Sequence, residues 1–126
     1  MCFIINDDFK EPLIAEEDIV CYKTCHESLL IQDTYISIHR GFIYEKGKRY
    51  DLDKPLKIKL SDLFDSHIIE NGFHSFCTYD YAKDETYYFS LIMECIIPKG
   101  STYYHNPDFV EYVSDSIIIK EQYINS

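Results

Sequence analysis

Hydrophobic and polar residues alternate over residues 34–44, where isoleucine stands at every second position for part of the segment. A period of two predicts a β-strand, because successive side chains of a strand point to opposite faces of the sheet. Gly41 predicts a bulge or bend within this strand. The segment Glu45-Lys-Gly47 then predicts a hairpin turn into a second strand over residues 48–52.

Further segments are rich in aliphatic and aromatic residues and contain no internal proline. They predict buried strands, because β-branched and aromatic side chains fit a pleated sheet. These segments are residues 18–24, 72–77, 91–97 and 116–119. The clearest is 91–97, which reads Leu-Ile-Met-Glu-Cys-Ile-Ile, and Pro98-Lys-Gly100 predicts the turn that follows it.

Two segments have the spacing of a short helix. The first covers residues 61–69. Leu60, Phe64 and Ile68 recur there every four positions, and Ser61 is the expected N-cap. The second begins at Thr78 or Asp80 and runs through Tyr88.

The order of strands, helix, strand, helix and strands predicts the α+β class. We expect a single domain over residues 1–126, with a mostly antiparallel or mixed sheet and two short helices. Residues 1–16 show no sustained period and predict an irregular N-terminal arm. The strand-rich stretch from Asn71 to Lys120 is the expected core.

Composition adds an acidic and aromatic character. The 126 residues include 12 Tyr and 8 Phe, and the net charge is -10. Repulsion between this charge and phosphates argues against nucleic acid as a partner. Residues 46–59 differ, because six basic residues against two acidic ones give this segment a local charge of +4. This segment is either an edge strand whose lysines discourage pairing with another chain, or a site for an anion or a partner.

Cysteine usage indicates a reducing compartment. The five cysteines are odd in number and scattered, which is typical of reduced thiols. The segment from Cys21 to His26 contains zinc-type donors but lacks the second close pair of a closed zinc site. No segment has the features of a signal peptide, and no apolar stretch approaches the ~20 residues that cross a bilayer. We therefore expect a cytoplasmic protein without a bound metal or membrane contact, and its oligomeric state stays open.

Four residues at strand ends or in polar loops are the candidate ligand-binding residues: Arg40, His74, Ser75 and Glu111. Arg40 precedes a glycine, where backbone approaches a ligand closely and the planar guanidinium grips phosphate or carboxylate. His74 and Ser75 are neighbours on one expected strand, so they point to opposite faces and cannot form a serine–histidine nucleophile pair. No residue is predicted to be catalytic.

Three segments, taken in order, resemble the pattern of the ADP-ribosyltransferases: His39-Arg-Gly41, Gly72-Phe-His-Ser-Phe-Cys-Thr78 and the stretch Cys95–Ile119. In that family an Arg on an early strand, a Ser-Thr-Ser strand start and a Glu before a late strand surround NAD. The resemblance implies an ADP-ribosyltransferase-like fold and an NAD-like ligand. It also implies that Arg40 matches the family's Arg and Ser75 its first Ser.

The chain departs from that pattern at the residues that carry catalysis. Ser75-Phe-Cys77 stands in place of Ser-Thr-Ser, and Ser114-Asp115-Ser116 precedes the late strand without a glutamate. Glu111 lies about four residues early. A carboxylate that stabilises an oxocarbenium-like centre tolerates little displacement. These departures favour a non-catalytic domain over an enzyme.

The segments Gly72-Phe-His-Ser-Phe76 and Ile97–Tyr104 are also similar to segments of small proteins from gut Bacteroidetes and their phages, a similarity that implies no function. The leading hypothesis is a non-catalytic binding or accessory domain, associated with phage, that accepts a nucleotide-like ligand and needs no resident cofactor. Two alternatives stay open. One is an active ADP-ribosyltransferase or NAD-glycohydrolase that uses Glu111 or Asp115. The other is a protein-interaction module without a small-molecule ligand.

Overall fold

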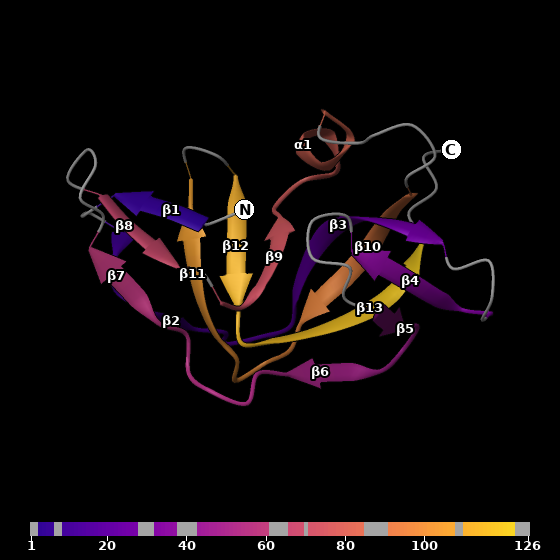
Figure 1. Ribbon diagram of the computed structural model, residues 1–126, viewed down its shortest axis with the longest axis horizontal. Helices are drawn as coiled ribbons and strands as arrows, with labels where there is room; N and C mark the ends of the chain where they lie inside the picture. The colour runs from indigo at the N-terminus through magenta and orange to yellow at the C-terminus, as the bar shows by residue number, and fades with distance from the viewer. Residues whose placement is uncertain are drawn as a thin grey trace.

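The computed structural model describes residues 3–6, 9–27, 32–37, 43–60, 66–69, 71–84, 91–107 and 110–122. Their strands form a ten-stranded sheet and a three-stranded sheet (Figure 1). Every pairing between these described strands is antiparallel. The chain is therefore a β-rich domain.

The large sheet runs in the order β2 (Leu13–Ile14), β11 (Thr102–Asn106), β12 (Glu111–Ser114), β9 (Phe73–Phe76), β3 (Ile19–Glu27), β10 (Leu91–Ile97), β13 (Ser116–Gln122) and β6 (Arg49–Asp51). A branch leaves β3 through β4 (Thr34–Ser37), which pairs with β5 (Ile43–Glu45). The small sheet has the order β1 (Phe3–Asn6), β8 (Ser66–Ile69) and β7 (Ile58–Leu60). The helix α1 (Tyr79–Asp84) lies against β3, β9 and β10.

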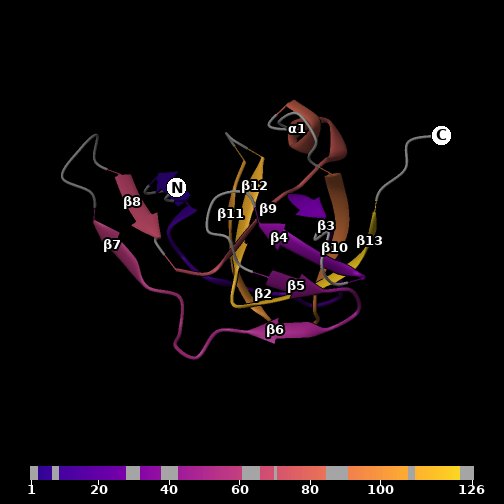
Figure 2. The ribbon, with the colours of Figure 1, turned by 45° about the vertical axis from the view of Figure 1, so that its right-hand side comes forward.

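The main core lies on one face of the large sheet, which we call the inner face. Alternate residues of β3, β10 and β13 are buried there, as the period of two requires. Two tyrosines of the β4–β5 hairpin, Tyr35 and Tyr44, belong to the same buried cluster. Figure 2 shows this hairpin lying in front of β3 and β10. The hairpin therefore covers the inner face.

The opposite, outer face is covered near β11 and β12 by the small sheet. Val113 of β12 and Tyr104 of β11 are buried in one cluster with Ile5 of β1 and Ile69 of β8. Strand β1 also contacts β11. Figures 1 and 2 both show the small sheet beside this end of the large one. The cover on this face explains why outward-facing residues of β11 and β12, Tyr104 and Val113, are apolar and buried.

The predicted α+β class with two short helices is wrong. Within the expected helix over residues 61–69, Ser66–Ile69 is the strand β8, and residues 61–65 lie outside the described part of the chain. β8 is the middle strand of the small sheet, so its backbone is paired on both sides and Ile69 is fully buried. This tertiary pairing overrides a weak helical periodicity.

The second helix is confirmed in its first part. α1 covers Tyr79–Asp84, and the Thr78 hydroxyl accepts a hydrogen bond from the Tyr81 backbone nitrogen at 3.4 Å. Thr78 thus supplies the predicted N-cap. The remainder of the expected helix, residues 85–88, lies outside the described residues.

The segment from residue 34 to residue 51 is connected differently from the prediction. β4 and β5 form a hairpin with each other in place of one continuous strand, and the expected bulge at Gly41 lies outside the described residues. The turn at Gly47 forms, but β6 pairs with β13 and not with β5. The Gly47 backbone nitrogen donates to the Ile119 carbonyl at 2.7 Å, which directs the chain towards β13.

The N-terminal segment is more regular than expected, because β1 and β2 both lie within residues 1–16. The strand over residues 91–97 is confirmed as β10 and the strand after Gly72 as β9. The turn at Pro98 is also confirmed, since the Ser101 backbone nitrogen donates to the Pro98 carbonyl at 3.1 Å. Among the described residues α1 is the one helix, and it is neither long nor apolar enough to span a membrane.

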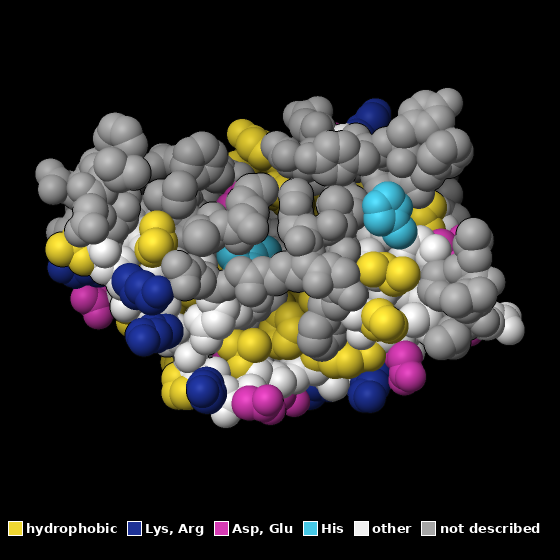
Figure 3. Space-filling view, in the orientation of Figure 1, with side chains coloured by type: hydrophobic (Ala, Val, Ile, Leu, Met, Phe, Trp, Pro, Cys, Tyr) yellow, Lys and Arg dark blue, Asp and Glu magenta, His cyan; other side chains and the backbone are white. Residues whose placement is uncertain are grey.

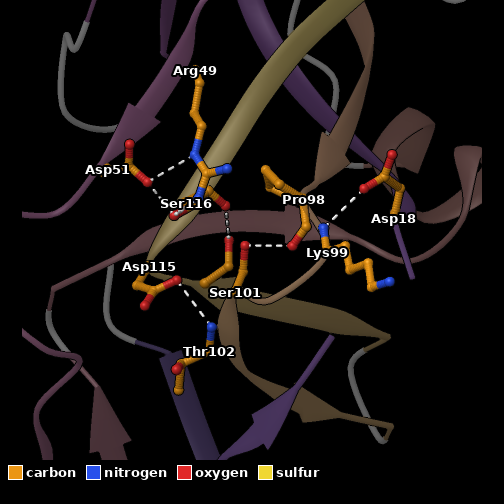
Figure 4. A network of polar contacts seen from close by, with 10 residues as sticks. Asp18, Arg49, Asp51, Pro98, Lys99, Ser101, Thr102, Asp115 and Ser116 are labelled. Atoms are coloured by element: carbon orange, nitrogen blue, oxygen red, sulfur yellow. Dashed lines mark hydrogen bonds and ion pairs between the residues drawn. The ribbon is translucent and has the colours of Figure 1, made fainter. Parts of the chain in front are cut away.

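Polar contacts join the turns at one end of the large sheet (Figure 4). The Asp115 carboxylate accepts a hydrogen bond from the Thr102 backbone nitrogen at 3.0 Å, which ties the bend between β12 and β13 to the start of β11. The Asp51 carboxylate accepts hydrogen bonds from the Ser116 hydroxyl at 2.5 Å and from Arg49 Nε at 3.0 Å. These contacts hold the edge strand β6 against β13.

We expect the substitution Asp51→Asn to destabilise the fold at neutral pH and to have a smaller effect in acid. Hydrogen bonds from Ser116 and Arg49 lower the pKa of Asp51 below its ordinary value. A carboxyl group with a depressed folded-state pKa contributes stability above its unfolded pKa, about 3.9, and loses it as the pH falls through the folded value. Urea unfolding of both proteins at about pH 7 and about pH 2 measures this. An equal difference in stability at both pH values would contradict the expectation.

Candidate functional site

The candidate residues Ser75 and Glu111 lie on opposite faces of the large sheet. In the pairing of β9 with β12, Tyr112 is opposite Ser75 and Glu111 is opposite Phe76. Ser75 is 3% exposed and lies on the inner face, whereas its neighbours in sequence point outwards. The alternation predicted for this strand is confirmed. Ser75 and Glu111 therefore do not line one site.

His74 shares the outer face with Glu111. Val113 is directly opposite His74, which makes His74 and Glu111 diagonal neighbours about 7–8 Å apart. Both side chains are partly buried. Arg40, the candidate anion-binding residue, lies outside the described residues. Within the described part of the chain, the structure thus brings together only the imidazole and one carboxylate.

Asp115, the other carboxylate considered for an enzyme, has a structural position. Its carboxylate is hydrogen-bonded to the Thr102 backbone, and its own backbone nitrogen donates to the Thr102 carbonyl at 3.0 Å. Its carbonyl accepts a hydrogen bond from the Leu52 nitrogen at 2.9 Å. These contacts fix the corner between β12 and β13, which accounts for an aspartate at this place.

The polar groups of the inner face form a different cluster. We call it the thiol cluster; it comprises Cys21, Lys23, Cys25, Ser75, Cys77 and Cys95. All four cysteines in it are free thiols. Three of them, Cys21, Cys25 and Cys95, are fully buried. The cluster is built from β3, β10, β9 and the residue that follows β9.

Lys23 is the charged member of the thiol cluster. It is only 9% exposed, and its ammonium donates a hydrogen bond to the His74 carbonyl. The ammonium also lies 5.6 Å from the centre of the Tyr44 ring. A cation over an aromatic face is stabilised by about 0.5–2 kcal/mol. These two contacts compensate the burial of a lysine on a core face.

Two of the thiols are held protonated by their surroundings. Burial raises the pKa of Cys25 to about 11, although the nearby charge of Lys23 opposes the change. Burial also raises the pKa of Cys77 to about 11, against a hydrogen bond with the Tyr112 hydroxyl. Thiols of this kind are poor nucleophiles at neutral pH, because the thiolate is the reactive form.

Cys21 and Cys95 form an unequal pair. Burial disfavours the Cys21 thiolate, but hydrogen bonds with the Cys95 thiol and the Ser75 hydroxyl, together with the charge of Lys23, hold the pKa of Cys21 below its ordinary value. Burial and the hydrogen bond with Cys21 raise the pKa of Cys95 well above its ordinary value. Apart from the Cys21 sulfur, no described residue engages Ser75 Oγ.

The cluster does not have the arrangement of a zinc site. Cys21 and Cys25 are four residues apart on one strand, which separates them by about 13 Å. His26 follows Cys25 directly and therefore points to the other face. The chemistry that this set of groups supports is that of thiols: hydrogen bonding, thiolate formation and disulfide formation.

Sequence reasoning missed Lys23 and the relation of Cys21 to Cys95. The alternation Cys21-x-Lys23-x-Cys25 in a strand was a usable signal, because it places these three side chains on one face. The pairing of Cys21 with Cys95 had no local signal, since 73 residues lie between them (95 − 21 − 1). Only the register of β3 with β10 brings them together.

Comparison with known proteins finds no match: no protein-family model, curated protein or solved structure matches this chain.

Proposed function

We propose that this chain is a non-catalytic binding domain whose ligand is an extended, basic segment of a protein, bound along the free edge of β2. The observation that carries the proposal is the exposure of both β2 residues: Leu13 is 45% exposed and Ile14 is 59% exposed. Among the described strands β2 pairs with β11 alone, so its other edge offers backbone hydrogen-bonding groups. An edge strand with exposed apolar side chains is a template for an added strand.

The charge around β2 supports a basic partner. Residues 10–18 hold one basic and four acidic residues, a local charge of -3, and all five of these side chains are exposed. Opposite charges at an interface steer the approach of a partner and disfavour partners of the wrong sign. A strand with lysine or arginine on either side of apolar residues fits this edge.

Two other edge strands, β6 and β7, differ from β2 in charge. Residues 46–59, with a local charge of +4, include β6 and part of β7. Figure 3 shows basic side chains at the left and lower borders of the molecule, with acidic ones beside them at the lower border, and Figure 1 places β7 at the left and β6 at the lower border. Lysines on an edge strand discourage unwanted pairing, which supports β2 over β6 as the binding edge. A second copy of this chain also carries such a basic segment, so the test must include self-association.

The positions of the carboxylates support a domain without catalysis. Ser75 is buried away from Glu111, and the Asp115 carboxylate is engaged by backbone. The free thiols support a reducing compartment, and we propose the cytoplasm as the site of action.

Fluorescence anisotropy with labelled synthetic peptides tests the proposed function. The probes are peptides of about six residues, the usual strand length, with alternating lysine and valine or alternating glutamate and valine. We expect the basic peptide to bind at least about tenfold more tightly, a difference of about 1.4 kcal/mol. Its binding should weaken as salt is added, because exposed charges are screened.

Charge reversal supplies the matched control. The double variant Glu16→Lys, Glu17→Lys removes the acidic surroundings of β2 and should abolish the preference for the basic peptide. The double variant Glu45→Lys, Glu121→Lys has the same change in charge at exposed positions outside residues 10–18 and should keep it. Equal affinity for both peptides, or binding of neither, would count against the proposal. Light scattering after size-exclusion chromatography shows whether a second copy occupies the edge.

A further inference from the structure

Cys21 and Cys95 lie directly opposite each other on two central strands of the large sheet. The pairing of β3 with β10 runs from Cys25 opposite Leu91 to Ile19 opposite Ile97 and includes Cys21 opposite Cys95. Opposite residues of an antiparallel pair have Cα atoms about 4.5–5.5 Å apart. A disulfide spans Cα separations of about 4.4–6.8 Å. The backbone therefore holds these two free thiols at a separation that a disulfide bridges.

The two sulfur atoms also face each other. The Cys95 thiol donates to the Met93 carbonyl at 3.4 Å, and the Cys21 sulfur is the other acceptor within its reach, the one that holds the proton when Cys21 is a thiolate. The pairing of β10 with β13 shifts register between Glu94 and Cys95. The extra residue is Lys120, so β13 is the strand that bends there, and β10 keeps its regular pairing with β3 through Cys95.

We propose that Cys21 and Cys95 form a reversible dithiol–disulfide pair that a small, neutral hydroperoxide oxidises. Both residues have 0% exposed surface, so a large, charged oxidant such as oxidised glutathione does not reach them. Hydrogen peroxide is little larger than a water molecule and carries no charge. The disulfide covalently joins β3 to β10 and lies in the core, apart from the β2 edge.

Cys21 is the attacking thiol and Cys95 the resolving thiol. The Lys23 charge and the Ser75 hydroxyl stabilise negative charge on the Cys21 sulfur, whereas Cys95 is held protonated by burial. A reactive cysteine is one whose surroundings favour the thiolate. A protonated resolving partner in contact with it is the arrangement that leads from a sulfenic acid to a disulfide.

The reaction balances with one peroxide. Cys21 loses its proton and its sulfur attacks one oxygen of hydrogen peroxide, so the O–O bond breaks and a sulfenic acid forms. The departing hydroxide takes up the proton and leaves as water. The Cys95 sulfur then attacks the Cys21 sulfur, the S–O bond breaks, and the second hydroxide leaves as water with the Cys95 proton. Two thiols and one peroxide thus give one disulfide and two waters.

Cys77 and Cys25 are the competing thiols. Cys77 follows the end of β9, and its hydrogen bond is with the Tyr112 hydroxyl rather than with Cys21. Cys25 is opposite Leu91, so it has no thiol across β10. The register therefore selects Cys95 as the partner of Cys21.

The test exposes the folded protein to hydrogen peroxide or to oxidised glutathione, alkylates the remaining thiols in denaturant and measures the intact mass. Peroxide should reduce the number of alkylated cysteines from five to three, and dithiothreitol should restore it. Peptide mapping should place the disulfide between Cys21 and Cys95. Oxidised glutathione should leave all five thiols alkylatable over the same time.

Single variants separate the roles of the two thiols. Cys95→Ser should stop at a sulfenic acid on Cys21, which dimedone traps, and Cys21→Ser should give neither product. Cys25→Ser and Cys77→Ser are matched controls and should still form the disulfide. No loss of thiols, glutathione attached to Cys21, or a disulfide that includes Cys25 or Cys77 overturns the proposal. Peptide mapping of the wild-type protein identifies the cysteines that form the disulfide even where a variant does not fold.

Discussion

Replacement of Gly72 by alanine is expected to lower the free energy of unfolding by about 3 kcal/mol, because strain and overpacking each contribute about 1–3 kcal/mol. Gly72 has a φ of +103°, which a residue with a side chain rarely adopts. A Cβ atom there would lie 2.6 Å from Leu56 Cδ2, 2.6 Å from Val113 Cγ2 and 3.2 Å from the Ser114 carbonyl oxygen.

The neighbours of Gly72 differ in how far they yield. Leu56 is partly buried and can rotate, but Val113 has a stiff, fully buried side chain between the two sheets. Relief of the clash therefore requires movement of β12 or of the small sheet. The effect should extend to packing between the sheets.

Urea unfolding of Gly72→Ala beside Gly47→Ala provides the comparison. Gly47 also has a positive φ, +81°, but no described atom outside its own chain neighbours lies within 4 Å of an added Cβ. Gly47→Ala should therefore cost only the backbone strain, about 1 kcal/mol. If Gly72→Ala lost no more stability than Gly47→Ala, the close approach between Gly72 and Val113 would not be present in solution.

Truncation of Ile119 to alanine is expected to cost about 3 kcal/mol of stability, within the 2–5 kcal/mol typical of buried isoleucine. Ile119 is fully buried on β13, opposite Cys95, and belongs to the core cluster beneath the β4–β5 hairpin. The cavity left there lies in the buried cluster on the inner face, where paired strands hold the surrounding residues in place and neighbouring side chains therefore fill it poorly.

The matched control is Ile43→Ala on β5. Ile43 is 55% exposed, so the same truncation should cost under about 1 kcal/mol. Denaturant midpoints with unchanged slopes show that both variants unfold in a comparable transition. Equal losses for the two variants would mean that the inner face is not the main core.

The sequence predicted strands best where it held a nearly continuous apolar run. Residues 91–97 form β10, in which Met93, Cys95 and Ile97 are fully buried on the inner face, and such a run is typical of a buried strand. The turn after Pro98 was predictable for a local reason as well, since Gly100 has a φ of +89° that glycine adopts without strain.

The errors occurred where two structures suited the same local pattern. The apolar spacing of residues 61–69 fits a helix, yet Ile69 pairs with Phe3 on one side and with Ile58 on the other. The turn at Gly47 was predicted correctly, but the partner of β6 is β13, about 65 residues further along the chain. Non-local pairing of this kind has no signature in a window of ten residues.

By itself, the sequence determined the strands with strong local patterns, the cap of α1 to within Thr78 or Asp80, the alternation of His74 and Ser75, and the unequal spread of charge. Each of these follows from neighbouring residues. Tertiary structure alone decided which strands pair, and with that it separated Ser75 from Glu111 and placed Cys21 opposite Cys95. The physical reason is register: a shift of one residue reverses the face of every side chain, and register is set by burial across the whole sheet.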